Sequence, residues 1–259
     1  MSKLLSVAIP TYEMHGLGAA FLAQSFDILT AQTFKDFDVV VSDHSKTDEI
    51  RKVCDAYADK IDIKYFKNEE KRGNSPANTN NAIKKSQGKL IKILFQDDFL
   101  YHEKSLEDIA KSFDLHKDAW LITGSESTMD TKVFFRPHTP YYDDRTILRT
   151  NTISSPSVLT IKNKDPLFFD ENLVWWMDLD YYKRCYERFG KPKILDSINV
   201  VNRVGAHQIS STRVDRSLKA KEYRYVLKKH NMSHVGLTVF FYRMSGYAYI
   251  LKKKIKKLI

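Results

Sequence analysis

The stretch "VVVSDHSKTDE", residues 39–49, decides the fold, because a run of valines passes directly into acids, a histidine and hydroxyls. Consecutive β-branched residues are typical of a strand that is buried on both faces. The polar residues mark the end of that strand, and ligands of open α/β sheets bind beyond the carboxyl ends of the strands. The stretch therefore predicts a buried strand with a ligand site at its end.

The segments around this strand alternate between strand-like and helical patterns, as in a parallel sheet wrapped by helices. Strands are predicted over 4–10, 37–43, 61–67 and 89–95, and helices over 17–33, 47–58, 75–87, 103–116 and 175–190. Ser45 and Asp48 have the spacing of a capping box for the second helix. The region 119–170, with "RPHTPYYDD" as a loop, is expected to extend the same sheet. We expect an α/β fold with a mostly parallel, Rossmann-like central sheet flanked by helices.

The chain has 259 residues, of which 42% are hydrophobic, enough for one large α/β domain or two small ones. Its net charge of +10 comes from the end of the chain, where from residue 217 onward eleven basic residues accompany one acid, Glu222. A basic tail on a neutral body favours a docking segment over a nucleic-acid-reading domain, so no nucleic-acid partner is expected. Cys54 and Cys185 lack zinc-site or disulfide spacing and are interpreted as core thiols.

The tail, residues 216–259, is predicted to be a basic amphipathic helix, and its interrupted apolar run is shorter than the roughly 20 residues that a spanning helix needs. Two interpretations stay open: a helix on an anionic membrane surface, and a helix packed on the domain with a solvated lysine end. His230 and His234 are interpreted as solvated. The amino terminus lacks a secretion-signal pattern, so a cytoplasmic protein is expected, peripheral at the inner face of a membrane in the first interpretation.

Two acids, Asp97 and Asp98, directly follow the fourth predicted strand and project to opposite sides of the chain. Mg²⁺ and Mn²⁺ are commonly held by one or two carboxylates together with nucleotide phosphate oxygens. The alternative is that both acids merely begin a loop. Neither G-x-G-x-x-G after a strand nor G-x-x-x-x-G-K-[ST] occurs, so a dinucleotide fingerprint and a Walker loop are both excluded.

Four stretches in this order, "SVAIPTYE", "VVVSDHSKTDE", "RGNSPANTNNAIKKSQGKLIKILFQDD" and "WWMDLDYYKRC", resemble the family 2 glycosyltransferases with the GT-A fold, over residues 4–210. The resemblance implies a donor site for a UDP-linked sugar, in which Asp43 accepts the N3 hydrogen of uracil and Asp97 faces the ribose. The implied nucleotide-binding residues are Pro10, Thr11, Tyr12, Glu13, Asp43, Arg72, Asn78, Gln96, Asp97 and Arg203. For Arg72 and Asn78 the alternative is a polar helix start around Pro76.

The resemblance also implies a divalent cation, Mn²⁺ or Mg²⁺, held by Asp98. Many relatives show Asp-x-Asp-Asp where this chain has "FQDD", residues 95–98, so the first acid of the motif is missing. In "NRVGAHQISST" Arg203 is implied as a diphosphate contact and His207 as a phosphate or metal ligand. A satisfied structural histidine is the alternative for His207.

"WWMDLD", residues 175–180, resembles the start of the family's catalytic helix and implies Asp178 as the general base. An inverting transfer needs a carboxylate that takes the proton of the attacking hydroxyl. The alternative for Asp178 and Asp180 is a pair of acids favoured by the helix macrodipole. For Trp175 and Trp176, stacking on a sugar ring and core packing both remain open.

We therefore expect an inverting, metal-assisted glycosyltransferase that passes a sugar from a UDP-sugar to a hydroxyl of a glycan or lipid-linked acceptor. Residues 1–215 are expected to form the GT-A domain, with a nucleotide-sugar-binding half, 1–100, and an acceptor-binding half, 101–215. The first alternative is a sugar-phosphate nucleotidyltransferase, although "PTYEMHGLG" lacks the basic residue of a phosphate loop. The second is a non-enzymatic membrane-docked or nucleic-acid-binding module that uses the basic tail.

Overall fold

The computed structural model describes residues 2–143, 146–148, 151–206, 208 and 214–232. The strands are β1 (Leu5–Thr11), β2 (Phe37–Asp43), β3 (Ile63–Lys67), β4 (Leu90–Ile93), β5 (Phe99–Leu100), β6 (Trp120–Thr128), β7 (Phe134–His138), β8 (Leu159–Lys162) and β9 (Lys193–Arg203). The helices are α1 (Gly18–Thr30), α2 (Glu49–Tyr57), α3 (Ser75–Lys85), α4 (Ser105–Ser112), α5 (Met177–Phe189) and α7 (Arg216–Lys229), with short 3₁₀ turns at η1 (Met14–Gly16), η2 (Thr146–Leu148) and η3 (Pro156–Val158).

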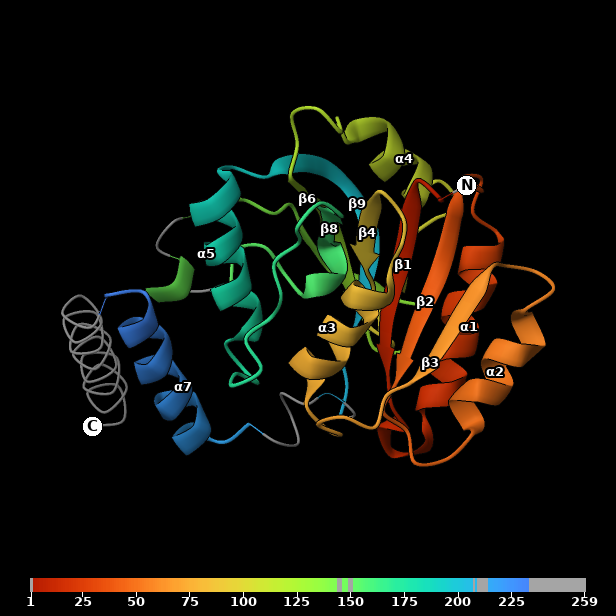
Figure 1. Ribbon diagram of the computed structural model, residues 1–259, viewed down its shortest axis with the longest axis horizontal. Coiled ribbons are helices and arrows are strands. Elements are labelled where there is room, and N and C mark those ends of the chain that lie inside the picture. The colour runs from red at the N-terminus through yellow and green to blue at the C-terminus, as the bar shows by residue number, and fades with distance from the viewer. Residues whose placement is uncertain (1, 144–145, 149–150, 207, 209–213, 233–259) are drawn as a thin grey trace, which may run out of the picture.

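Within these described residues, nine strands form one sheet in the order β3-β2-β1-β4-β8-β6-β9-β5, and β7 pairs with β6 outside this path (Figure 1). β1 pairs in parallel with β2 and β4, β2 with β3, and β6 with β9. β5, β7 and β8 run antiparallel to their neighbours. The expected α/β fold is therefore confirmed, with a parallel first half and a mixed second half. The region 119–170 extends the sheet, as predicted.

Helices cover both faces of this sheet (Figure 1). On one face, Leu5, Val7 and Ile9 of β1 pack in a core with apolar residues of α1, α2 and α4. On the other, Ala8 of β1 and Ile91 of β4 pack in a core with α3, α5 and α7. Alternate residues of one strand thus enter different cores, which is why the central strands have continuous apolar sequences rather than alternating ones.

The carboxyl ends of the first three strands lie level with one another. Thr11 pairs with Asp43, and Asp43 pairs with Lys67. Because these strands are parallel, the polar residues that follow them gather at one edge of the sheet.

Two local predictions are wrong. The capping box does not form, because Asp48 is the N-cap of α2 without any side-chain capping hydrogen bond. Instead, Asp43 Oδ1 accepts the amide of Ser45 at 2.8 Å, and the loop turns on Asp43. The segment predicted as a loop from residue 136 begins as strand, since Phe134–His138 pairs with β6.

Helix α7 packs against the rest of the molecule beside α5 (Figure 1), and its Val226 and Leu227 belong to the core that contains α5. The interpretation of His230 as solvated is wrong, because its side chain is 5% exposed and its Nε2 lies 3.0 Å from Asp180 Oδ1. The rest of the tail, residues 233–259 with His234, lies outside the described residues. Among the helices that the structure does describe, none has the length and apolar character to cross a membrane.

Candidate active site

A cavity of about 610 Å³ lies beyond the ends of β1, β2 and β4 and receives residues from both halves of the chain. The sequence-predicted residues in its lining are Pro10, Tyr12, Asn78, Gln96, Asp97, Asp98 and Asp178. The predicted metal-binding and base carboxylates thus face one space. Thr11, Glu13, Asp43, Arg72 and Arg203 lie outside its lining, and His207 lies outside the described residues.

Asn78 joins the ends of the first two strands. The start of α3 that presents it is well specified, because Asn74 accepts the Ala77 amide at 2.9 Å as an N-cap and a proline follows in the first turn. Asn78 Nδ2 donates to the carbonyls of Thr11 and Ser42, each at 3.0 Å. Its Oδ1 accepts the Ser42 hydroxyl at 2.7 Å. With 4% of its surface exposed, Asn78 shapes this part of the cavity wall through the backbone of its neighbours.

Gln96 fixes the loop after β1. Its Oε1 accepts the amide of Tyr12 at 2.9 Å, and its Nε2 donates to the Gly18 carbonyl at 2.7 Å. A Cβ on Gly18 would stand 2.2 Å from the Tyr12 carbonyl and 2.8 Å from Gln96 Nε2, so only glycine permits this approach. The neutral side chain in the acidic motif therefore serves to order the loop that carries Tyr12.

Asp43 lies behind the cavity wall. It is fully buried, and its oxygens accept hydrogen bonds from Ser45 N–H at 2.8 Å and Tyr65 OH at 2.7 Å. Lys67 Nζ lies 3.4 Å away, and the buried Thr11 hydroxyl lies 3.3 Å from Oδ1. Asp43 thus orders the ends of β1, β2 and β3, and its contact with uracil stays a prediction.

Two other residues of the predicted donor site, Glu13 and Arg72, lie near the cavity without lining it. Glu13 accepts the amide of Lys46 and ties the loop after β1 to the loop after β2. Arg72 is exposed and lies 3.6 Å from Glu69. It precedes Gly73, which does line the cavity.

Asp98 is held deep in the cavity wall, with 5% of its surface exposed. Its Oδ2 accepts the Ser155 hydroxyl at 3.0 Å, and its Oδ1 accepts the Arg203 amide at 3.1 Å. Burial and the adjacent charge of Asp97 raise the pKa of Asp98 above its ordinary value, against the hydrogen bonds of Ser157, Ser155 and Arg203. Two close carboxylates with this electrostatic strain are a site that a positive ligand would stabilise.

Arg203 supports this acidic pair from the far side. Its guanidinium lies 4.2 Å from the ring centroid of Phe21 and 5.3 Å from that of Phe99. Nε donates to the Asp97 carbonyl at 3.1 Å, and a terminal nitrogen donates to Gln24. The Arg203 side chain thus connects β9 to α1 and to the loop that carries Asp97 and Asp98. Its contact with a diphosphate stays a prediction.

The donor set fits a divalent cation bound through one or two carboxylates and completed by phosphate oxygens. Asp97 and Asp98 supply the carboxylates at the cavity wall. Across the described residues, no group of three His, Cys, Asp or Glu side chains is arranged to hold a metal. An ion held there would need further ligands beyond these two carboxylates, such as phosphate oxygens.

Asp178 lies in the first turn of α5. Asn151 Nδ2 donates to its Oδ2 at 2.7 Å, and the Leu179 amide donates to its Oδ1 at 2.8 Å. Burial raises the pKa of Asp178 to about 6, although these hydrogen bonds act in the opposite direction. Near neutral pH the carboxylate is ionised yet basic enough to accept a proton, as general-base catalysis requires.

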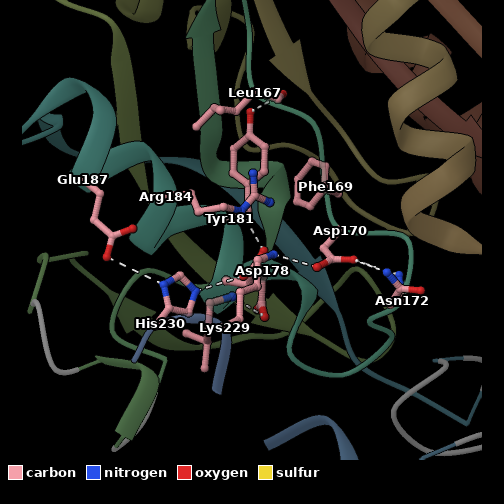
Figure 2. Close-up of polar contacts among 12 residues, drawn as sticks. Leu167, Phe169, Asp170, Asn172, Asp178, Tyr181, Arg184, Glu187, Lys229 and His230 are labelled. Atoms are coloured by element: carbon pink, nitrogen blue, oxygen red, sulfur yellow. Dashed lines mark hydrogen bonds and ion pairs between the residues drawn. The ribbon is translucent and has the colours of Figure 1, made fainter. Parts of the chain in front are cut away.

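An ionic cluster holds the next turn of α5. Asp180, fully buried, accepts from Arg184 Nε at 2.8 Å and lies 2.8 Å from Lys229 Nζ and 3.0 Å from His230 Nε2. Figure 2 shows Lys229 next to His230, and His230 in contact with Glu187 of α5. Burial pushes the pKa of Asp180 upward, but His230, Arg184 and Lys229 outweigh it and hold that pKa below its ordinary value. These ion pairs give Asp180 a structural role, through partners that the sequence did not indicate.

Trp175 and Trp176 have different surroundings. Trp175 lines the cavity and is 37% exposed. Trp176 packs on the core and on Tyr223 of α7, with ring centroids 5.1 Å apart.

Sequence reasoning missed several residues of the lining, among them His44, Arg136, Asn151 and Ser155. His44 is 3% exposed, and burial lowers its pKa; its place beside Asp43 in the opening stretch was a usable signal. Arg136 brings an exposed cation into the lining from β7, which the sequence pattern did not predict.

Comparison with known proteins gives a consistent result. A model described as "Glycosyl transferase family 2" matches residues 6–167. An uncharacterized glycosyltransferase of Rickettsia prowazekii is 26% identical over 231 residues, which are 83% of this chain and 68% of the relative. The poly(ribitol-phosphate) beta-N-acetylglucosaminyltransferase TarS of Staphylococcus aureus is 27% identical over 113 residues, which are 43% of this chain but 19% of the relative. The chain therefore matches only part of the length of its relatives.

Solved structures share the fold, and two of them contain a nucleotide sugar. Residues 1–349 of S. aureus TarS, in complex with UDP-GlcNAc, superpose with a TM-score of 0.70 at 19% identity, covering 95% of this chain and 75% of that one. The mannosyltransferase PcManGT of Pyrobaculum calidifontis, in complex with GDP-Man and Mn²⁺, gives 0.57 at 15% identity, covering 92% and 65%.

The matched family segment contains β1 to β4, the acidic loop and the Asn151 turn of the cavity. The nucleotidyltransferase and non-enzymatic alternatives are thereby set aside. On its sequence and its architecture, the chain belongs to glycosyl transferase family 2 and is a glycosyltransferase with the GT-A fold.

Proposed function

We propose that the chain transfers a sugar from a UDP-sugar to a hydroxyl group of a glycan or lipid-linked acceptor, with inversion at the anomeric carbon. The observation that carries the proposal is that Asp98 and Asp178, from different halves of the chain, line one cavity. The donor would lie against the half formed by 1–100 and the acceptor against 101–215. The UDP-GlcNAc complex of TarS supports a uridine nucleotide and suggests the first sugar to test.

In the proposed reaction, Asp178 accepts the proton of the acceptor hydroxyl while that oxygen attacks the anomeric carbon. The bond between the anomeric carbon and the diphosphate breaks on the opposite face, so the configuration inverts and UDP leaves with the bonding electrons. Asn151 and the Leu179 amide hold both oxygens of Asp178 and so orient the carboxylate. Trp175 offers an exposed ring against which a sugar can stack.

Asp97 and Asp98 are the residues that would hold Mn²⁺ or Mg²⁺ with the diphosphate, and such an ion would neutralise charge on the departing UDP. The PcManGT complex with GDP-Man and Mn²⁺ supports an ion in this role. Ser155 and the Arg203 amide fix the orientation of Asp98.

The base role is tested with Asp178→Asn. Transfer from UDP-GlcNAc, or from the UDP-sugar that a donor panel identifies, should fall about 10²- to 10⁴-fold, the usual contribution of a general base. UDP affinity should not change. Asp36→Asn is the matched control, because this acid is exposed just before β2, at the opposite end of the strand from the cavity. Full turnover by a folded Asp178→Asn protein would remove Asp178 from the mechanism.

The metal site is tested by calorimetric titration of UDP with Mn²⁺ and with EDTA. UDP affinity should drop at least about tenfold, or 1.4 kcal/mol, when the ion is removed. In Asp98→Asn the two titrations should agree. Equal affinity with and without Mn²⁺ in the unaltered protein would reject this site.

A further inference from the structure

Three consecutive backbone amides converge on one side chain of α7. The amides of Val174 and Trp175 each lie 2.9 Å from a carboxylate oxygen of Glu222, and the amide of Trp176 lies 3.0 Å away. Glu222 is 3% exposed. Hydrogen bonds to an ionised group are about twice as strong as neutral ones, so this contact restrains the 174–176 segment firmly.

The restrained segment leads directly into the helix that carries Asp178. Trp176 is the N-cap residue of α5, and its carbonyl accepts the Asp180 amide at 3.0 Å. Trp176 itself forms no side-chain capping bond there. Amides at a helix start are unsatisfied within the helix, and the helix dipole makes this end positive. Of the three amides that Glu222 binds, that of Trp176 is at the helix start and those of Val174 and Trp175 lie in the loop before it, so the buried carboxylate ties this loop to the start of α5.

Helix α7 also seats the two tryptophans. Trp176 Nε1 donates to the Lys219 carbonyl at 3.3 Å, and its ring packs on Tyr223. The Lys219 ammonium lies 4.1 Å from the ring centroid of Trp175. One turn of α7 therefore determines the course of the backbone and the direction of both rings, only one of which enters the cavity.

We propose that Glu222 is a positioning residue for transfer: by binding the amides of residues 174–176, it fixes the turn that presents Asp178 and Trp175 to the acceptor. The inference rests on the proposed function of Asp178. Glu222 lies beyond the segment 6–167 that matches the family model, and it is the one acid among the basic residues from 217 onward. An acid at this position of a basic segment is explained by the three backbone amides that donate hydrogen bonds to it.

The test compares Glu222→Gln with Tyr225→Phe in the full chain. Gln keeps the shape of the side chain but loses the charge and one acceptor oxygen. The control removes one hydrogen bond between α7 and the same loop, from Tyr225 OH to Asp170 Oδ2 at 2.9 Å, without touching 174–176. Amide hydrogen exchange over 170–180, UDP affinity, kcat and donor KM are measured for each protein.

In Glu222→Gln, exchange at 174–176 should accelerate at least about tenfold, since local opening becomes easier. The value of kcat should fall about 10- to 100-fold, the effect expected of a base displaced by about 1 Å. Donor KM and UDP affinity should stay within about twofold, because the donor half is unchanged. Tyr225→Phe should match the unaltered protein in kcat and in exchange at 174–176.

Three results would overturn the inference: unchanged exchange at 174–176, faster exchange with unaltered kcat, or a parallel loss of kcat and UDP affinity. If Glu222→Gln does not fold, Glu222→Asp applies the same criteria, because it keeps the charge but withdraws the oxygens by one methylene. Failure of the proposed function shows elsewhere, as an unaltered protein that uses no UDP-sugar or as an active Asp178→Asn protein. Exchange at 174–176 does not depend on turnover and separates the two failures.

Discussion

Replacing Asn151 by leucine should move the acid limb of the pH–rate profile toward neutral pH. Leucine has a similar shape but cannot donate the 2.7 Å hydrogen bond that Asn151 gives to Asp178. That bond stabilises the ionised carboxylate, which is the form that accepts a proton. Its removal favours the protonated form, so the pKa of Asp178 rises and activity is lost at a higher pH than before.

The size of the shift follows from the strength of the bond. A hydrogen bond to a charged group contributes about 1.5–3 kcal/mol, and one pKa unit corresponds to about 1.4 kcal/mol. The pKa of Asp178, about 6 in the unaltered protein, should therefore rise by about one to two units. With a pKa of about 7.5, the ionised fraction at pH 7 falls from about 90% to about 25%. The value of kcat/KM at pH 7 should fall about fourfold, and it should recover above about pH 8.5.

The assay is kcat/KM for transfer from the UDP-sugar between pH 5 and 9. Asn151 also orders its own turn, because its Oδ1 accepts the amides of Ile153 and Ser154. Asn151→Asp keeps that acceptor and adds a like charge, so its shift should exceed that of the leucine variant. An acid limb that stays in place or moves to lower pH in both variants would refute the assignment of this limb to Asp178.

Three further substitutions test the frame around the site. Asn78→Ala removes four buried hydrogen bonds, to the Thr11 carbonyl, the Ser42 carbonyl and hydroxyl, and the Asn68 side-chain amide, and should lower the unfolding free energy by about 2–4 kcal/mol in urea denaturation; a loss under about 0.5 kcal/mol would contradict its role. Gly18→Ala places a methyl group 2.2 Å from the Tyr12 carbonyl and should weaken UDP binding in calorimetry, whereas unchanged affinity would show that the turn adapts freely. The lowered pKa of Asp180 means that its stabilisation is complete above about pH 4 and is lost as pH falls through the folded-state pKa. Thermal melting of Asp180→Asn should therefore show lower stability at pH 7 and a weaker decline on acidification; an unchanged decline would exclude Asp180 as its source.

Local patterns predicted the elements well where the chain's own chemistry decides the structure. Phe37–Asp43 forms the predicted strand over the predicted residues, because its β-branched run is buried on both faces. The predicted helix at 75–87 is observed as Ser75–Lys85, with an asparagine cap and a proline in its first turn. The polar residues after the fourth predicted strand indicated Asp98, and the family resemblance of residues 175–180 indicated Asp178; both line the one cavity.

The rest depends on contacts between residues far apart in the chain, which leave no periodic signal. His230 was predicted to be solvated, because nothing near it in the sequence reveals Asp180 as its partner. Glu222 was seen only as an exception in a basic run, since the amides that it binds lie in the loop before α5. The capping box at Ser45 failed for a related reason, because Asp43 captures the amide of that residue first.

The continuous sheet has a consequence for how the molecule moves. A rigid-body rotation of residues 1–100 relative to 101–215 would separate β4 from β8. In this antiparallel pair Leu90 lies opposite Lys162 and Lys92 lies opposite Thr160. The rotation would also withdraw the guanidinium of Arg203 from the rings of Phe21 and Phe99. We therefore expect no clamshell motion, and substrates would reach the cavity by rearrangement of its rim alone. The distance between Asp98 and Asp178 across the cavity would then be set when the protein folds and would not depend on domain closure.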